Sequence, residues 1–175
     1  MEKDSSQVET FNQVIDSWLI HLANYTSAEW KAKPSPTSWS IGQLYQHLIE
    51  VTAFHFGQIR ICLSDNSNAL QEASPEARKM FAANEFPNQL IEGPPSNDRT
   101  PQPETKEQIR DDLVRLKHEL NNEIIEMFET SSFFGKTRHP GLLFFNAYEW
   151  LQFSAMHMRH HLRQKRRIDD FLSRS

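Results

Sequence analysis

The sequence predicts an all-α protein, a four-helix bundle with a long crossover between its second and third helices. Apolar residues recur three and four positions apart over four long segments, which is the period of an amphipathic helix. No segment alternates apolar and polar residues over a length that would indicate a strand. Between the second and third segments lies a proline-rich stretch at about 65–104 without helical periodicity.

Composition favours one soluble domain spanning 1–175. The hydrophobic fraction of 38% is enough for a single core, and the net charge of -4 gives no attraction to nucleic acid or to an anionic membrane. The single cysteine, Cys62, excludes an internal disulfide and fits a reducing compartment. The polar N-terminus is unlike a signal peptide, and no apolar run reaches the roughly 20 residues of a membrane helix. We expect a cytoplasmic protein.

The first two predicted helices occupy 6–29 and 40–64. The first ends before the serine- and proline-rich "KPSPTSWS". The second begins at Ser40, because Ser40 and Gln43 have the spacing of a capping box. A short helix is expected within the crossover, at about 76–83. A crossover of this length lets two successive helices of a bundle run parallel, and it is also a candidate lid over a site.

The last two predicted helices begin at similar capping pairs. These pairs are Thr105 with Gln108, and Asn146 with Glu149. The third helix extends to about 128 and the fourth to about 172. Between them, "TSSFFGKTRHPGLLFF" is expected to form a loop, with Pro140 and Gly141 as helix breakers.

Histidines are concentrated in the fourth helix, within "EWLQFSAMHMRHHLRQKRR". His157 and His161 are four residues apart, so they point the same way from successive turns, the geometry that chelates zinc in H-E-x-x-H sites. The pair His157 and His160 is also allowed by helical spacing. We favour His161, because His160 shares its flank with Arg163 and Arg167, which are expected to be exposed to water.

A third ligand must come from another part of the chain, since catalytic zinc sites usually have three protein ligands and an open position. His47 is the best candidate, because it lies on the apolar side of the second helix, and His55, two turns later, is the alternative. His21 is interpreted as a core residue and His118 as solvated. His139, in the loop before the fourth helix, is the remaining candidate.

Two motifs resemble the DinB-like (YfiT-like) metalloenzyme superfamily. They are "WSIGQLYQHL" at 39–48 and "EWLQFSAMHMRHHLRQ" at 149–164, and the resemblance covers nearly the whole chain. It implies an up-down-down-up bundle, often a homodimer, with a divalent metal held by three histidines. The matching positions here are His47, His157 and His161. Zinc or nickel is favoured, with iron or manganese as further candidates.

The function that this resemblance implies is metal-dependent chemistry on a small molecule. Characterised members include thiol transferases that use bacillithiol, mycothiol or glutathione, and a maleylpyruvate isomerase. We therefore expect a transferase or hydrolase whose substrate is a small molecule, with a low-molecular-weight thiol as the favoured partner. The alternatives are a metal- or ligand-binding bundle without catalysis and a helical interaction module without metal.

No catalytic base can be identified from the sequence. Gln43, Glu50 and Gln164 lie within about a turn of the predicted ligands, so they are candidates to orient the imidazole rings.

Overall fold

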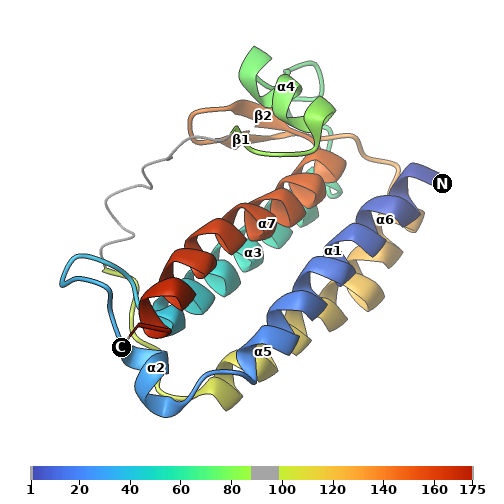
Figure 1. Ribbon diagram of the computed structural model, residues 1–175. Coiled ribbons are helices and arrows are strands. Elements are labelled where there is room, and N and C mark those ends of the chain that lie inside the picture. Colours follow the sequence, from blue (N-terminus) through green and yellow to red (C-terminus); the bar gives the residue numbers. More distant parts are fainter. Residues whose placement is uncertain (1, 88–98, 175) are drawn as a thin grey trace.

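The computed structural model describes residues 2–87 and 99–174, and these residues form a mostly helical protein. Its long helices are α1 (Glu2–Leu22), α3 (Ile41–Cys62), α5 (Lys106–Glu119) and α7 (Ala147–Leu172). Helix α7 packs against α3 and α1, and α5 packs against the same two helices, which makes a bundle (Figure 1). The predicted helical class is confirmed, and the up-down-down-up order stays a prediction.

The predicted starts of α3 and α7 are confirmed by their hydrogen bonds. The Ser40 hydroxyl accepts from the backbone N–H of Gln43, whose side chain accepts from the backbone N–H of Ser40. Asn146 and Glu149 make the same reciprocal pair at α7. Such pairs satisfy N–H groups that have no partner within the helix, so they fix where each helix begins.

Two predicted helices are divided in the structure. The first predicted helix ends at Leu22, and a separate short helix, α2 (Ser27–Lys31), begins at a capping box made by Thr26 and Glu29. The third predicted helix contains a π-helical turn, η2 (Leu120–Ile124), between α5 and α6 (Ile125–Thr130).

The segment before α7, predicted to be a loop, contains a small hairpin. Strands β1 (Thr137–His139) and β2 (Leu143–Phe145) pair antiparallel. The turn passes through Gly141 at a φ of +93°, a backbone region that glycine enters without strain. The expected helix within the crossover is α4 (Pro75–Ala83), and it lies with the hairpin at one end of α7 (Figure 1). Residues 88–98, part of the crossover that is the predicted lid, lie outside the described residues.

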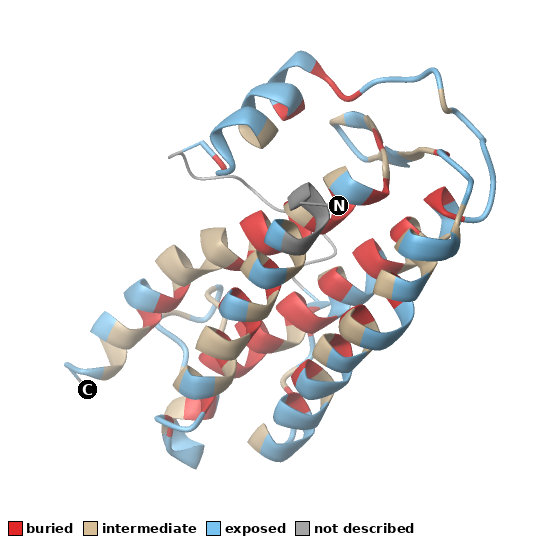
Figure 2. Ribbon diagram, turned by 90° about the vertical axis from the view of Figure 1, so that its right-hand side faces the viewer, coloured by how far each residue is buried: buried red, intermediate tan, exposed pale blue. Residues whose placement is uncertain are grey.

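The buried residues face one another between the long helices (Figure 2). Many of their side chains are aromatic. Trp18 and Tyr45 meet edge to face at 5.0 Å, and the Tyr45 hydroxyl donates to the backbone oxygen of Trp18 at 2.8 Å. This contact packs α1 against α3, the helix that carries His47. In the part of the chain that the structure describes, no helix has both the length and the apolar character needed to span a membrane.

Candidate metal centre

Three imidazole rings from two distant segments converge between α3 and α7. We call His47, His157 and His161 the histidine cluster. One ligand nitrogen from each ring lies within 4.8 Å of the others. The ring centroid of His47 is 5.2 Å from that of His157 and 4.9 Å from that of His161. The extensive packing of α3 on α7 brings together side chains that are far apart in the sequence.

The spacing of the two α7 histidines fits a shared metal ion. Their Nε2 atoms are 3.1 Å apart. Two nitrogens that each lie about 2.0 to 2.1 Å from a tetrahedral zinc ion are about 3.3 Å from one another. The donor set is also suitable, because neutral imidazoles bind zinc, nickel and iron. The described residues therefore fit a divalent ion.

Gln164 fixes the orientation of one ring in the histidine cluster. Nδ1 of His161 is 2.9 Å from the side-chain oxygen of Gln164. A carbonyl oxygen only accepts, so Nδ1 carries the proton and Nε2 has its lone pair facing His157. This is the tautomer that a ligand binding through Nε2 requires. Among the described residues, Nδ1 of His157 is buried without a hydrogen-bond partner.

All three imidazoles are neutral at pH 7. Burial lowers the pKa of His47 to about 4. Burial, and then the neighbouring His47, lower the pKa of His161 to about 3. Burial, followed by the proximity of His161, also lowers the pKa of His157 well below its usual range. Because metal binding requires unprotonated nitrogens, no proton has to be removed from an imidazolium before an ion binds.

Aromatic side chains form walls around the histidine cluster. The Trp39 ring lies 4.8 Å from His47, and the Phe86 ring lies 6.4 Å from His157. Trp39 belongs to the motif noted in the sequence, but Phe86 was not predicted to be near the site. The available signal was one large apolar side chain in the otherwise polar "NEFPN" of the crossover. Of the three histidines beside these rings, His47 is buried and His157 and His161 are half-buried.

The sequence profile of the DinB superfamily matches residues 10–164, most of the chain and all of the histidine cluster. The chain belongs to the DinB superfamily. No curated protein matches it.

In this DinB-superfamily protein, His55, the alternative third ligand, is not part of the histidine cluster but lies next to it. Its side chain is 2% exposed, and its ring centroid is 5.9 Å from that of His157. Nδ1 of His55 lies 2.9 Å from the Ser154 hydroxyl, which itself donates to the backbone oxygen of Trp150. Since that hydroxyl proton is already used, Nδ1 of His55 is the donor. Burial, with His139 and His47 as smaller causes, lowers the pKa of His55 to about 3.

The remaining histidines lie elsewhere in the DinB bundle. His118 is exposed on α5, as predicted, and His21 lies on α1. His139, on β1, packs 4.9 Å from the Phe145 ring. His160 is half-buried, not fully exposed on its flank, because its ring packs 5.2 Å from Phe86.

Of the three candidates to orient the ligands, Gln164 is the one with a hydrogen bond to a ring of the histidine cluster among the described residues. Gln43 caps α3 and donates to the backbone oxygen of Thr100, and the exposed Glu50 accepts from Gln46. No carboxylate or thiol in the described ranges completes the metal-ligand group. Cys62 is buried, and its thiol donates to the backbone oxygen of Phe145.

Proposed function

We propose that this DinB-superfamily protein is a metal-dependent enzyme acting on a small molecule, of the thiol transferase or hydrolase type. The observation that carries this proposal is the convergence of His47, His157 and His161 to within 4.8 Å of one another. In the proposal these residues hold one divalent ion, with zinc or nickel favoured over iron or manganese, in a homodimeric bundle of up-down-down-up topology. A low-molecular-weight thiol is the favoured partner of the small-molecule substrate.

The chemistry that a divalent ion supplies in such a setting is Lewis acidity, which lowers the pKa of a coordinated water or thiol. Three neutral imidazoles add no negative charge, so they preserve this acidity. Gln164 holds the His161 ring in the tautomer that leaves Nε2 available. Burial keeps the rings unprotonated, and the Trp39 and Phe86 rings pack beside His47 and His157.

The proposal is tested by the metal content of protein purified without a histidine tag. We expect about one equivalent of zinc, nickel, iron or manganese in the wild type, lost in His157→Ala and retained in the matched control His118→Ala. His118 is exposed on α5, away from the histidine cluster. A wild-type protein that retains none of these ions after incubation with each would overturn the metal site.

Catalysis is tested separately from metal binding. The metal-loaded protein is incubated with an electrophile and a low-molecular-weight thiol, and in parallel with a panel of esters and amides. We expect turnover in the wild type and none in His157→Ala. Metal retention without turnover in either panel would favour the alternative, a metal- or ligand-binding bundle that is not an enzyme.

A further inference from the structure

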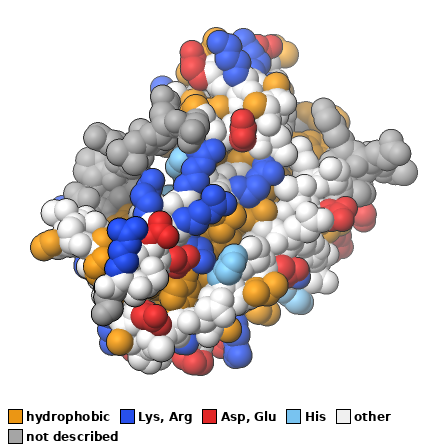
Figure 3. Space-filling model, viewed as in Figure 1, with side chains coloured by type: hydrophobic (Ala, Val, Ile, Leu, Met, Phe, Trp, Pro, Cys, Tyr) orange, Lys and Arg blue, Asp and Glu red, His pale blue; other side chains and the backbone are white. Residues whose placement is uncertain are grey.

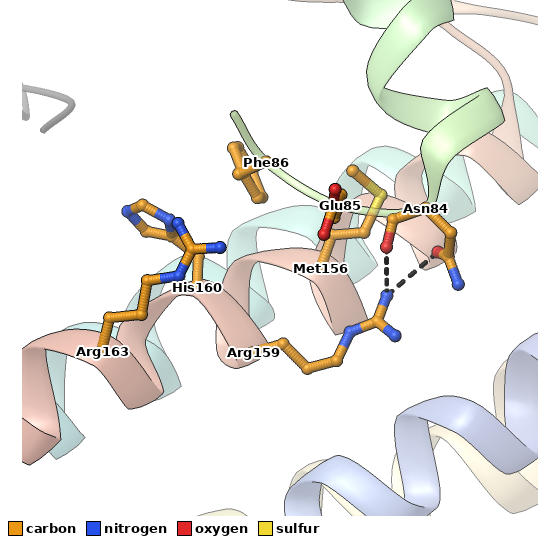
Figure 4. A pocket seen from close by; sticks show the side chains of 7 residues that line it. All are labelled: Asn84, Glu85, Phe86, Met156, Arg159, His160 and Arg163. Carbon is orange, nitrogen blue, oxygen red and sulfur yellow. Dashed lines mark hydrogen bonds between the residues drawn. The ribbon is translucent and has the colours of Figure 1, made fainter. Parts of the chain in front are cut away.

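A small cavity lies between α7 and the segment that follows α4. Its volume is about 160 Å³ (Figure 4). We call it the arginine pocket, and its lining residues are Asn84, Glu85, Phe86, Met156, Arg159, His160 and Arg163. Sites for complete small-molecule ligands usually measure about 300 to 1,000 Å³. The arginine pocket is therefore the right size for one functional group of a ligand.

Among the described residues that line the arginine pocket are two cations and one carboxylate. Arg159 and Arg163 are four residues apart on α7, so they start from successive turns of the same side. The guanidinium group of Arg159 turns toward Asn84, and that of Arg163 lies beside His160 (Figure 4). Glu85 is the acidic residue in the lining, and no ion pair joins it to Arg159 among the described residues. Figure 3 shows Lys and Arg side chains gathered on the face that carries α7. Since the whole chain has a net charge of -4, this local excess is not a consequence of composition.

Arg159 is held in place by a backbone turn. Its Nη2 donates to the backbone oxygen of Asn84 at 2.8 Å and to the side-chain oxygen of Asn84 at 3.0 Å. Gln152 donates to the same side-chain oxygen and to the backbone oxygen of Phe81, which fixes Asn84 in turn. Within the described ranges, both hydrogen bonds of Arg159 use Nη2, so its other N–H groups can donate to a ligand. Guanidinium groups ordered in this way pair well with carboxylate and phosphate oxygens.

The arginine pocket shares walls with the histidine cluster. The Phe86 ring packs 5.2 Å from His160 in the pocket and 6.4 Å from His157 in the cluster. The His160 ring is 5.5 Å from that of His161. A ligand with one group in the arginine pocket therefore has the rest of its structure beside the histidine cluster.

We propose that the arginine pocket binds a carboxylate or phosphate group of the substrate or of its thiol partner, through Arg159 and Arg163. The role of this group as part of the substrate rests on the proposed function. Binding of the anion itself does not, because none of the ligating histidines lines the pocket.

The test measures binding of succinate and of inorganic phosphate to the metal-free protein by calorimetry. We expect Arg159→Gln and Arg163→Gln each to weaken binding about tenfold or more, the usual effect of losing a hydrogen bond to a charged group. Arg166→Gln is the matched control, since Arg166 is exposed on the same helix and does not line the pocket; its affinity should match the wild type. Tighter binding of succinate indicates a carboxylate ligand, and tighter binding of phosphate a phosphorylated one.

Two results would overturn the proposal. The first is that the wild type binds neither probe up to the solubility limit of succinate. The second is that Arg166→Gln weakens binding as much as the pocket variants do. The anion would then be attracted by the overall positive charge of the helix and not bound in the pocket. Thermal melts of each variant identify any loss of folding. Chemical shifts of the Arg159 side-chain N–H in the wild type, recorded during the titration, report binding without any substitution.

Metal analysis of the same proteins separates this inference from the proposed function. Arg159→Gln should keep its metal while losing the anion. If the wild type binds the anion, Arg159→Gln does not, and neither protein holds metal, the arginine pocket is supported and the metalloenzyme proposal is refuted. If the wild type holds metal but binds neither anion, the metal site is supported and the arginine pocket is refuted.

Discussion

At the residue scale, the decisive contact is the one between Gln164 and Nδ1 of His161. A ring that rotates freely must be ordered and placed in the correct tautomer when an ion binds. A side-chain oxygen that already accepts the Nδ1 proton removes part of this cost. The spacing of His157 and His161 places their two rings on one side of the helix, but the tautomer of His161 depends on Gln164.

Replacing Gln164 by Leu should weaken zinc binding about 10- to 100-fold, because the His161 ring loses its only described hydrogen-bond partner on Nδ1. The measurement is a competition titration with a chelator of known zinc affinity. Gln46→Leu is the control, since Gln46 lies on α3 and bonds to the exposed Glu50. Equal affinities for wild type and Gln164→Leu would show that this contact does not order the ring.

His55 predicts a pH dependence of folding stability. Burial lowers its folded-state pKa to about 3, below the value of about 6.5 expected in the unfolded chain. The unfolded chain therefore binds more protons between these values, so the contribution of His55 is complete above pH 6.5 and is lost as pH falls from 6.5 toward 3. In metal-free protein, His55→Gln should reduce the stability loss between pH 7 and pH 5 by about 2 kcal/mol.

Urea unfolding at the two pH values measures this difference. His118→Gln, at an exposed position on α5, is the control and should lose as much stability as the wild type. The result would contradict the assignment if His55→Gln showed the same decrease as the other two proteins.

At the element scale, helix α3 carries two glycines in different surroundings. A methyl group on Gly42 would lie 2.9 Å from a ring carbon of Trp30 and 3.0 Å from its backbone oxygen, whereas one on Gly57 would meet nothing within 4 Å. We expect Gly42→Ala to destabilise the fold by about 1 to 3 kcal/mol through overpacking. Gly57→Ala should stabilise it by about 0.5 to 1 kcal/mol, since alanine favours the helix.

Chemical denaturation of both glycine variants tests this contrast, and each serves as the control for the other. Changes of the same sign would mean that α3 does not approach the short helix α2 as described.

Local sequence signals identified the beginnings of the helices better than their interruptions. Ser40 with Gln43 and Asn146 with Glu149 were recognised because their hydrogen bonds involve only neighbouring residues. Thr26 and Glu29 have the same spacing, and their capping box separates α2 from α1, where a single helix was predicted. The π-helical turn at Leu120–Ile124 and the hairpin at 137–145 depend on packing against other elements, so the local sequence contains less information about them.

The candidate site shows a similar division. The positions of His47, His157 and His161 follow from helical periodicity together with a resemblance between motifs. The position of Phe86 could not be predicted, since it depends on how the crossover returns to α7. Of the two histidines on the buried side of α3, His47 lies in the histidine cluster and His55 lies beside it.

At the scale of the whole molecule, an ion that binds the folded chain alone must stabilise it. Free zinc at 100 times its dissociation constant adds about 2.7 kcal/mol. For a chain of this size, that stabilisation raises the melting temperature by roughly 5 to 10 °C. We expect the increase in the wild type and in His118→Ala, measured by calorimetry at fixed protein concentration. A similar increase in His157→Ala would place the stabilising ion elsewhere.

The placement of the histidine cluster between α3 and α7 has a mechanical consequence. An ion bound there would act as a reversible cross-link, joining two helices that are otherwise connected through a long stretch of chain that includes the whole of α5. Either helix could then separate from its neighbour only after a ligand had dissociated. Amide hydrogens in the middle of both helices should therefore exchange with solvent more slowly, and to a similar extent, when the ion is present.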